Sequence, residues 1–248
     1  MAQQSRITGE EAFVLHTYPY RETSLIVELF TRQFGRVSAV AKGAKRSSSN
    51  MKTSLQAFRP LHVSWGGRSE LKTLFDAEWR TGTLPPKGNA LMSAFYMNEL
   101  LLKLLIREDP HENLFSVYEG AIKALGANAP SIEKILRRFE RQLLTELGYG
   151  MTLTQDVRNN ESVVPNALYT YVIGRGAVRI NQGDDVEFKI TGKALVDIEN
   201  DALDDPRTLA QYKALMRLVI SHHLGRKTLH TRRLFTDLQD EQLIHDKT

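Results

Sequence analysis

The chain has 248 residues, of which 42% are hydrophobic and 25% charged, and its formal net charge is +4. This composition is ordinary for a globular protein, and the length allows one large domain or two modest ones. The absence of cysteine excludes disulfides, thiolate zinc sites and cysteine nucleophiles. Residues 1–11 are polar, and the longest apolar block, residues 100–106, is interrupted by Lys103. We therefore expect a cytoplasmic protein with no signal peptide and no membrane span.

In chain order, the first 80 residues show an apolar alternation that predicts short strands. The runs cover residues 12–17, 24–31, 35–42, 61–65 and 71–79. A Tyr-Pro-Tyr sequence at 18–20 predicts a turn after the first run, and a Gly-Gly-Arg-Ser sequence at 66–69 predicts a hairpin. Five strands with a break between the third and fourth are the strand count of an OB-type barrel. An SH3-like barrel fits the pattern nearly as well.

The positive charge is concentrated in residues 32–72. This stretch holds nine Lys and Arg residues against one acid, Glu70, an excess of 9 − 1 = +8. Residues 1–80 have a balance of 12 − 7 = +5, whereas residues 81–248 have 21 − 22 = −1. Residues 42–52 combine glycine, serine and basic side chains, which predicts an exposed loop suited to a polyanion. The alternative is a lysine-rich surface loop that only confers solubility.

Beyond this region the composition predicts helices. Residues 81–88, rich in proline and glycine, predict a linker. Caps and apolar periodicity predict helices over residues 89–107, 113–125, between Ser131 and Gly148, from Thr191, over 206–224 and over 228–238. Residues 169–180 predict a hairpin. The expected fold is thus α+β and multidomain, with an N-terminal five-stranded OB-type barrel (1–80), a linker (81–88) and a mainly α-helical domain (89–248) that carries a small β-hairpin insert (149–190).

The sequence contains no catalytic motif that we recognise. A phosphate-binding Walker loop, a G-x-S-x-G elbow and an H-E-x-x-H zinc helix are all missing. His222 and His223 are adjacent, but neighbours on a helix point about 100° apart and are poorly placed to share a metal. We therefore expect a protein that is not an enzyme, with no catalytic residue, no cofactor and no bound metal.

The remaining hypothesis is binding. A small barrel with a cationic loop favours nucleic acid, whose phosphates it would neutralise while aromatic rings stack on bases. The candidate contacts are Arg21, Arg32, Arg36, Lys42, Lys45, Arg46, Lys52 and Arg68, with Tyr18 and Tyr20 as stacking residues. Phe34, Phe58 and Trp65 are weaker stacking candidates, and Phe58 and Trp65 are of types more often found in a core.

A second candidate surface lies on the helix after Ser131. Its arginines beside apolar side chains could hold an acidic peptide with an apolar end. The residues are Arg137, Arg138, Arg141 and Phe139. A plain amphipathic helix with solvated arginines is the alternative interpretation.

Several segments, in order along most of the chain, resemble one known family. They are residues 12–15 (AFVL), 20–25 (YRETSL), 35–37 (GRV), 40–44 (VAKGA), 55–58 (LQAF), 98–101 (NELL), 136–140 (LRRFE), 147–150 (LGYG) and 232–235 (RRLF). Together they are similar to the bacterial DNA repair protein family RecO. The family's pattern, an N-terminal OB domain and a C-terminal helical domain, agrees with the elements predicted above.

The resemblance also implies a role and partners. A RecO-like protein would bind single- and double-stranded DNA and anneal complementary strands in the nucleoid. It would work with RecR to load RecA on strands coated by single-strand binding protein, whose acidic C-terminal tail is a further expected partner. Many members carry a four-cysteine zinc module, which this sequence lacks, so the insert at 149–190 should be metal-free. An RNA-binding barrel protein and a pure protein adaptor remain the alternatives.

Overall fold

The structure, a computed structural model, describes residues 6–47, 49–82 and 84–231. These residues form two compact units, one made of the residues up to 132 together with those from 227 onward, the other of residues 133–226. The expected linker at 81–88 lies inside the first unit, because the two helices that follow it pack on the barrel.

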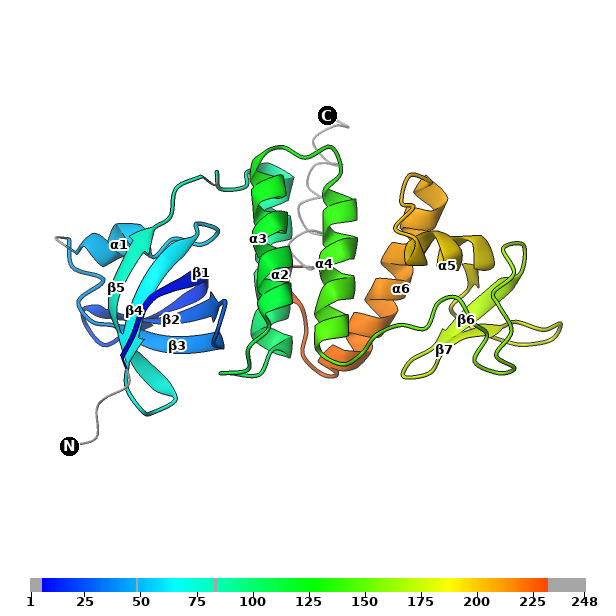
Figure 1. Cartoon of the computed structure of the whole chain (residues 1–248), viewed down its shortest axis with the longest axis horizontal. Helices are drawn as coiled ribbons and strands as arrows, with labels where there is room; N and C mark the ends of the chain where they lie inside the picture. The colour runs from blue at the N-terminus through cyan, green and yellow to red at the C-terminus, as the bar shows by residue number, and fades with distance from the viewer. Residues whose placement is uncertain (1–5, 48, 83, 232–248) are drawn as a thin grey trace, which may run out of the picture. The chain divides into compact units, whose positions relative to one another are not determined.

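The first unit begins with a closed five-stranded barrel (Figure 1). Its strands are β1 (Arg6–Tyr20), β2 (Ser24–Thr31), β3 (Gly35–Ala41), β4 (Leu61–Gly66) and β5 (Leu71–Trp79). They follow the order β1-β2-β3-β5-β4, and β4 pairs back to β1. Only β3 and β5 are parallel. This closure is that of an OB-type barrel, so the predicted fold class is confirmed and the SH3-like alternative is not adopted.

The prediction of a turn at Tyr18-Pro19-Tyr20 was wrong. β1 continues through Tyr20, and Pro19 pairs with Leu25 of β2. Because β4 pairs with β1 only as far as Ala12, the later part of β1 has one unpaired side. There a proline without an N–H disrupts no ladder. The chain turns at residues 21–23 instead, with Arg21 at φ +52°.

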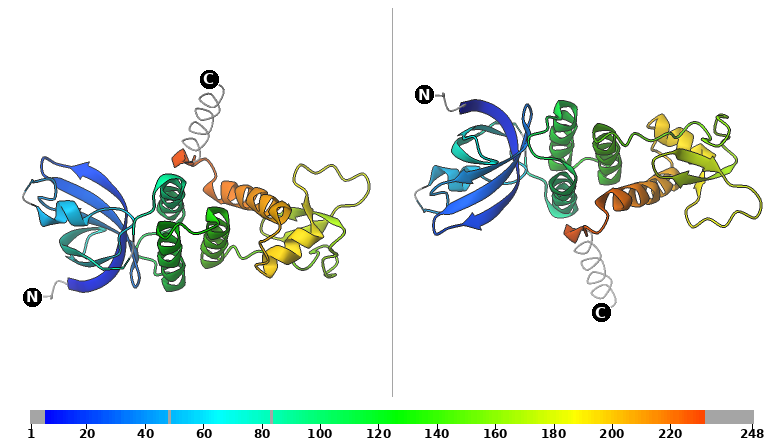
Figure 2. Two further views of the ribbon diagram at one scale, coloured as in Figure 1. Left: turned by 90° about the horizontal axis from the view of Figure 1, so that it is seen from above. Right: turned by 90° about the horizontal axis from the view of Figure 1, so that it is seen from below.

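Helix α1 (Asn50–Ser54) was not predicted. It spans five residues between β3 and β4, has no buried side chain and packs beside β5. A helix of five residues with no buried side chain is too short to show the apolar periodicity by which helices are recognised in a sequence. In Figures 1 and 2, α1 lies on the side of the barrel turned away from α2 and α3.

Helices α2 (Gly88–Leu104) and α3 (Glu112–Gly126) cover one outer face of the barrel. Figure 2 shows them side by side against it. Phe13 and Phe30 point outward from β1 and β2, and their rings pack against the α3 rings of Phe115 and Tyr118, with centroids 5.1–5.8 Å apart. Inner and outer faces of β1 and β2 are therefore both buried, which explains their nearly continuous apolar sequence.

A buried polar bridge joins this barrel face to both helices. The Asn98 amide on α2 donates to the Leu15 carbonyl at 2.9 Å, and the Tyr118 hydroxyl donates to Asn98 Oδ1 at 2.6 Å. The β1 register shifts between Val14 and His16, which frees the Leu15 carbonyl from the ladder. Asn98 thus satisfies a backbone group that the sheet leaves open.

Glu99 on the same helix holds the C-terminal segment of this unit. Its carboxylate accepts from the backbone amides of His230 and Thr231 at 2.8 and 2.9 Å and from the Thr231 hydroxyl at 2.6 Å. Burial alone would raise the pKa of Glu99, but these hydrogen bonds outweigh it and hold the pKa below its ordinary value. Most of the helix predicted over 228–238 falls outside the described residues.

The second unit contains the remaining helices and a small sheet. Its elements are α4 (Ile132–Glu146), β6 (Leu168–Val172), β7 (Gly176–Arg179), β8 (Ile190–Thr191), α5 (Gly192–Glu199) and α6 (Pro206–Leu224). The sheet has the order β7-β6-β8, so the predicted hairpin is present with one added short strand. Thr191 and Asp205 accept backbone amides at the starts of α5 and α6, which confirms both predicted caps. In the described part of the chain, no helix combines the length and apolarity needed to cross a membrane.

Candidate nucleic-acid interface

The loop after β3 presents three cations to solvent. Lys42, Lys45 and Arg46 are all exposed. Consecutive turns shape the backbone, with the Arg46 amide donating to the Gly43 carbonyl at 3.0 Å and Gly43 at φ +70°. A side chain at position 43 would be strained at this φ, so glycine permits the sharp turn that separates Lys42 from Lys45.

A backbone hydrogen bond ties this loop to the turn between β1 and β2. The Lys45 amide donates to the Thr23 carbonyl at 2.9 Å, which brings the loop beside Arg21. The Arg21 guanidinium lies 5.2 Å from the centre of the Tyr20 ring. Tyr18, further back on β1, is exposed and contacts the His16 ring edge-on at 4.4 Å. Six predicted contacts from two segments distant in sequence thus lie at one end of the barrel: Lys42, Lys45 and Arg46 from the loop, and Tyr18, Tyr20 and Arg21 from the end of β1 and the turn after it.

Lys52 continues this surface, whereas Arg68 does not. Lys52 is exposed on α1, directly after the loop. Arg68 precedes β5, which runs parallel to β3 with Ser38 opposite Leu71. In a parallel pair the starts of both strands lie at one end and their ends at the other. Arg68 is therefore at the opposite end of the barrel from the loop that follows β3.

We name the gathered cations the basic rim: Arg21, Lys42, Lys45, Arg46 and Lys52. All five are exposed, and within the described ranges no carboxylate forms an ion pair with them. Glu22 is the only acid in the turn that carries Arg21. The five cations give this part of the surface a positive electrostatic potential, which favours a polyanionic ligand.

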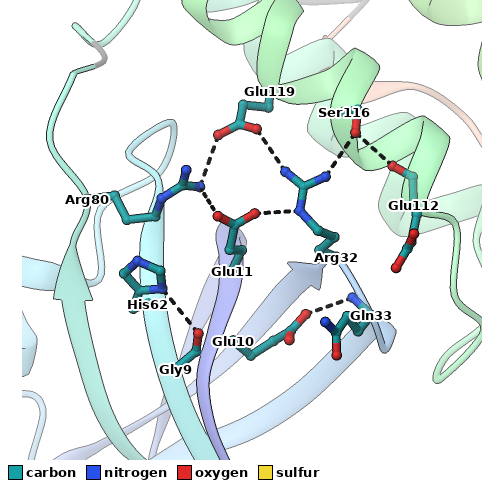
Figure 3. A network of polar contacts seen from close by, with 10 residues as sticks. All are labelled: Gly9, Glu10, Glu11, Arg32, Gln33, His62, Arg80, Glu112, Ser116 and Glu119. Carbon is teal, nitrogen blue, oxygen red and sulfur yellow. Dashed lines mark hydrogen bonds and ion pairs between the residues drawn. The ribbon is translucent and has the colours of Figure 1, made fainter.

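Arg32 has a different environment from the one predicted. Figure 3 shows it in a ring of four charged side chains, with Glu11 and Arg80 from the barrel and Glu119 from α3. Its guanidinium binds the Glu11 carboxylate, and Nη2 lies 3.1 Å from Glu119 Oε2. Arg32 therefore joins the barrel to α3 and has little capacity left for a phosphate.

Replacing Arg32 with alanine should destabilise the first unit and leave nucleic-acid affinity unchanged. We expect a loss of about 1–2 kcal/mol, because Arg80 still pairs with both acids while the Arg32 hydrogen bonds are lost. Urea unfolding and oligonucleotide anisotropy would measure the two quantities separately. Reduced affinity at unchanged stability would contradict this prediction and show that Arg32 contacts the nucleic acid.

Arg36 and Lys72 are also engaged internally. Arg36 donates to the Leu102 carbonyl on α2 and lies 3.7 Å from Glu28, and burial lowers the pKa of its guanidinium. Lys72 Nζ lies 2.8 Å from Glu108 Oε1. Part of the +8 excess therefore binds the chain itself. The acids concerned stand outside residues 32–72 in the sequence, which is why the local count overstated the free charge.

The covering of the barrel by α2 and α3 restricts where a ligand can bind. In OB-type barrels the face of strands 2 and 3 and the neighbouring loops commonly contact oligonucleotides. Here most outer side chains of β2 and β3, including Glu28, Phe30 and Ser38, are buried. A ligand is left with the loops and ends of the barrel, where the basic rim lies.

The stacking candidates also separate clearly. Phe58 and Trp65 are buried, and Phe34 is half-buried with its ring edge-on to Trp65 at 5.4 Å. On the barrel strands that the structure describes, the exposed rings are instead Tyr18 and two aromatic residues of β5, Phe75 and Trp79. Sequence reasoning passed over both β5 residues, because alternation in a strand does not reveal a bulge. Ser64 pairs with Asp76 and Trp65 with Leu74, so Phe75 is an extra residue of β5 without a partner on β4.

The predicted peptide surface on α4 is mostly not available to a partner. Phe139 is fully buried and Arg137 is 6% exposed, so these two residues were wrongly placed at a surface. The Arg137 side chain is buried together with the apolar residues of α4. Its charge is tolerated there because the guanidinium pairs with the Glu140 carboxylate one turn later, at 2.8 Å.

The other two arginines of α4 remain accessible but are already paired. Arg138 binds the Asp201 carboxylate at 2.8–3.0 Å. Arg141 binds Glu199 and the Ile198 carbonyl, each at 2.8 Å. Both guanidiniums therefore hold the acidic end of α5, which a carboxylate-bearing ligand would have to displace.

The fold and the rim define the class of protein: an OB-type barrel with a basic rim, followed by a helical region. Comparison with known proteins identifies one family over both parts of the chain. Residues 6–82 match the family model described as Recombination protein O N terminal, and residues 86–233 match Recombination protein O C terminal. The chain belongs to the RecO family of DNA repair proteins, as the sequence segments indicated.

Relatives named DNA repair protein RecO support this at nearly full length. The chain is 48% identical to that of Nitrosospira multiformis over 95% of this chain and 98% of the relative. It is 44% identical to that of Dechloromonas aromatica and 46% identical to that of Aromatoleum aromaticum, each over 97% of this chain and 100% of the relative.

Proposed function

We propose that this protein is a recombination mediator that binds single- and double-stranded DNA through the basic rim, with little sequence preference. The observation that carries the proposal is the separation of the cations into two sets. Arg32 and Arg36 are held by carboxylates and a carbonyl, whereas the five rim side chains face solvent without an acid paired to them among the described residues. Cations that contact phosphates but no base edges give affinity without sequence readout.

The proposed mechanism is non-covalent. Two complementary strands repel each other through their phosphates, and rim cations reduce this repulsion so that the strands can approach and pair. Base pairing supplies the driving force, and the protein acts without catalytic residues or cofactor. Annealing should therefore proceed without nucleotide hydrolysis.

The proposed partners follow from family membership and the α4 surface. We propose that the protein works with RecR to load RecA on DNA coated by single-strand binding protein, in the cytoplasm at the nucleoid. Arg138 and Arg141 are the proposed contacts for the acidic tail of the coating protein, because they are the α4 arginines that remain accessible; carboxylates of the tail would replace those of Asp201 and Glu199. Docking there would raise the effective concentration of the rim near coated DNA.

The test is equilibrium binding of a labelled single-stranded oligonucleotide across a salt series. If all five rim cations contact phosphates, log affinity should fall against log salt with a slope of about −3.5, at roughly −0.7 per contact. A slope near zero would contradict phosphate binding. Absence of binding even at low salt would favour an adaptor that binds an acidic protein. RNA of matched sequence that outcompetes the DNA would instead favour the RNA-binding alternative.

A further inference from the structure

Trp79 is a partly exposed ring held in a fixed position. It ends β5 and is 43% exposed, whereas the other tryptophan, Trp65, is 3% exposed. Its indole Nε1 donates to the Ser54 carbonyl at 2.9 Å, and the Arg59 guanidinium lies 4.2 Å from the ring centre. These two contacts fix the ring while much of its apolar surface remains in water.

Helix α1 connects this ring to the basic rim. Ser54, which binds the indole, is the last residue of α1, and Lys52 stands two residues before it. Five helical residues span about 7.5 Å, so Lys52 of the rim lies within one short helix of the residue that binds the ring. The cations and the aromatic surface therefore adjoin each other through one element.

We infer that Trp79, with Arg59, forms a stacking site for an unpaired base of a DNA strand whose phosphates lie on the basic rim. This inference rests on the proposed function and assigns the Trp79 site to single-stranded nucleotides, whereas the basic rim takes the phosphates of single strand and duplex alike. Stacking on an aromatic ring uses the face of the base and tolerates any base. Bases inside a duplex are stacked on each other, so the site discriminates an unpaired strand from a duplex.

The indole geometry accounts for the lack of sequence readout at this site. The only donor of the ring is occupied by Ser54, so it offers no hydrogen bond to a base edge. A base stacked there keeps its pairing edge available. The site would thus hold a strand in a state that can still meet its complement.

Phe75 on the same strand provides a matched control. It is 44% exposed, and the Arg6 guanidinium lies 5.1 Å from its ring centre. It stands four residues before Trp79, roughly 13 Å along β5. It therefore has the same combination of exposed ring and arginine, without the link to α1.

The experiment titrates the full chain with an unlabelled thymidine oligonucleotide and follows tryptophan emission. A parallel titration measures affinity from the anisotropy of a labelled oligonucleotide. We expect emission to fall at the same concentrations at which anisotropy rises. Trp79→Phe, which retains Trp65, should show no such fall. A duplex of equal length should bind without quenching.

Affinity measurements on variants complete the test. Trp79→Ala should weaken single-strand binding about tenfold and duplex binding less than twofold, while Phe75→Ala changes neither by more than about twofold. Oligonucleotide binding without a change in Trp79 emission would overturn the stacking site and leave the proposed function intact. Equal quenching by single strand and duplex would also overturn the inference. Absence of all binding would instead refute the proposed function.

Discussion

Reversing Lys42, Lys45 and Arg46 together to glutamate should lower the affinity for a single-stranded oligonucleotide about 100-fold at 0.1 M salt. Each single-strand phosphate contact adds roughly 0.7 to the salt slope, so three contacts contribute about 2. The three contacts contribute nothing to the affinity at 1 M salt. Because log affinity rises by about 2 for each tenfold decrease in salt, they contribute about 100-fold to the affinity at 0.1 M. The variant should also show a flatter salt dependence, reduced by about 2.

The control for this variant must change the net charge equally at another place. Arg175, Arg179 and Lys189 are exposed in the second unit and have no ion pair among the described residues. Their joint reversal to glutamate should weaken binding far less, because none of the three belongs to the proposed interface and salt screens charges that do not contact the bound strand. An equal loss in both variants would show that binding depends on net charge and not on the loop.

Replacing Asn98 with alanine should cost the first unit about 2–4 kcal/mol of stability. The amide links the Leu15 carbonyl to the Tyr118 hydroxyl, and both of these partners are buried. Without Asn98, each buried group is left without this hydrogen bond, at a cost of about 1–3 kcal/mol per group. A loss of this size is a large fraction of the 5–15 kcal/mol that stabilises an ordinary domain.

Urea unfolding followed by tryptophan emission is the suitable measurement, since both tryptophans lie in the first unit. Tyr118→Phe removes the hydroxyl that donates to Asn98 and should cost about 1 kcal/mol. Ser93→Ala is the control on the same helix, because the Ser93 hydroxyl donates only to the Asn89 carbonyl within the helix. A loss in Asn98→Ala no larger than that in Ser93→Ala would contradict the bridging role.

The strands and helices were largely predictable because their signals are local. Alternation over residues 24–31 and 71–79 matched β2 and β5 to the residue. Caps at Thr191 and Asp205 marked the starts of α5 and α6, since a cap depends on residues two or three positions away. The continuation of β1 through Pro19 was not predictable, because the missing N–H is tolerated only where one side of the strand is unpaired.

In the candidate site, too, some features were predictable from local sequence and others depended on contacts between distant segments. Sequence alone located the basic loop, because glycine, serine and lysine within a few residues favour exposure whatever packs elsewhere. Only the tertiary structure assigned Arg32 and Arg36 to internal contacts, since their partners Glu119 and Leu102 are more than 60 residues away. The burial of Phe139 was also decided by the tertiary structure. The apolar stripe of a helix does not indicate which of its side chains a neighbouring element will cover.

The sequence by itself determined five N-terminal strands, the helical remainder, the basic loop and the resemblance to the RecO family, because each depends on residue types over short windows; the strand pairing then decided for the OB-type closure. The tertiary structure decided which cations are free, that α2 and α3 bury the outer face of β2 and β3, and that Trp79 stands beside the rim. These facts depend on which distant segments meet, and that choice is made by packing and by the pairing of buried polar groups across the whole unit.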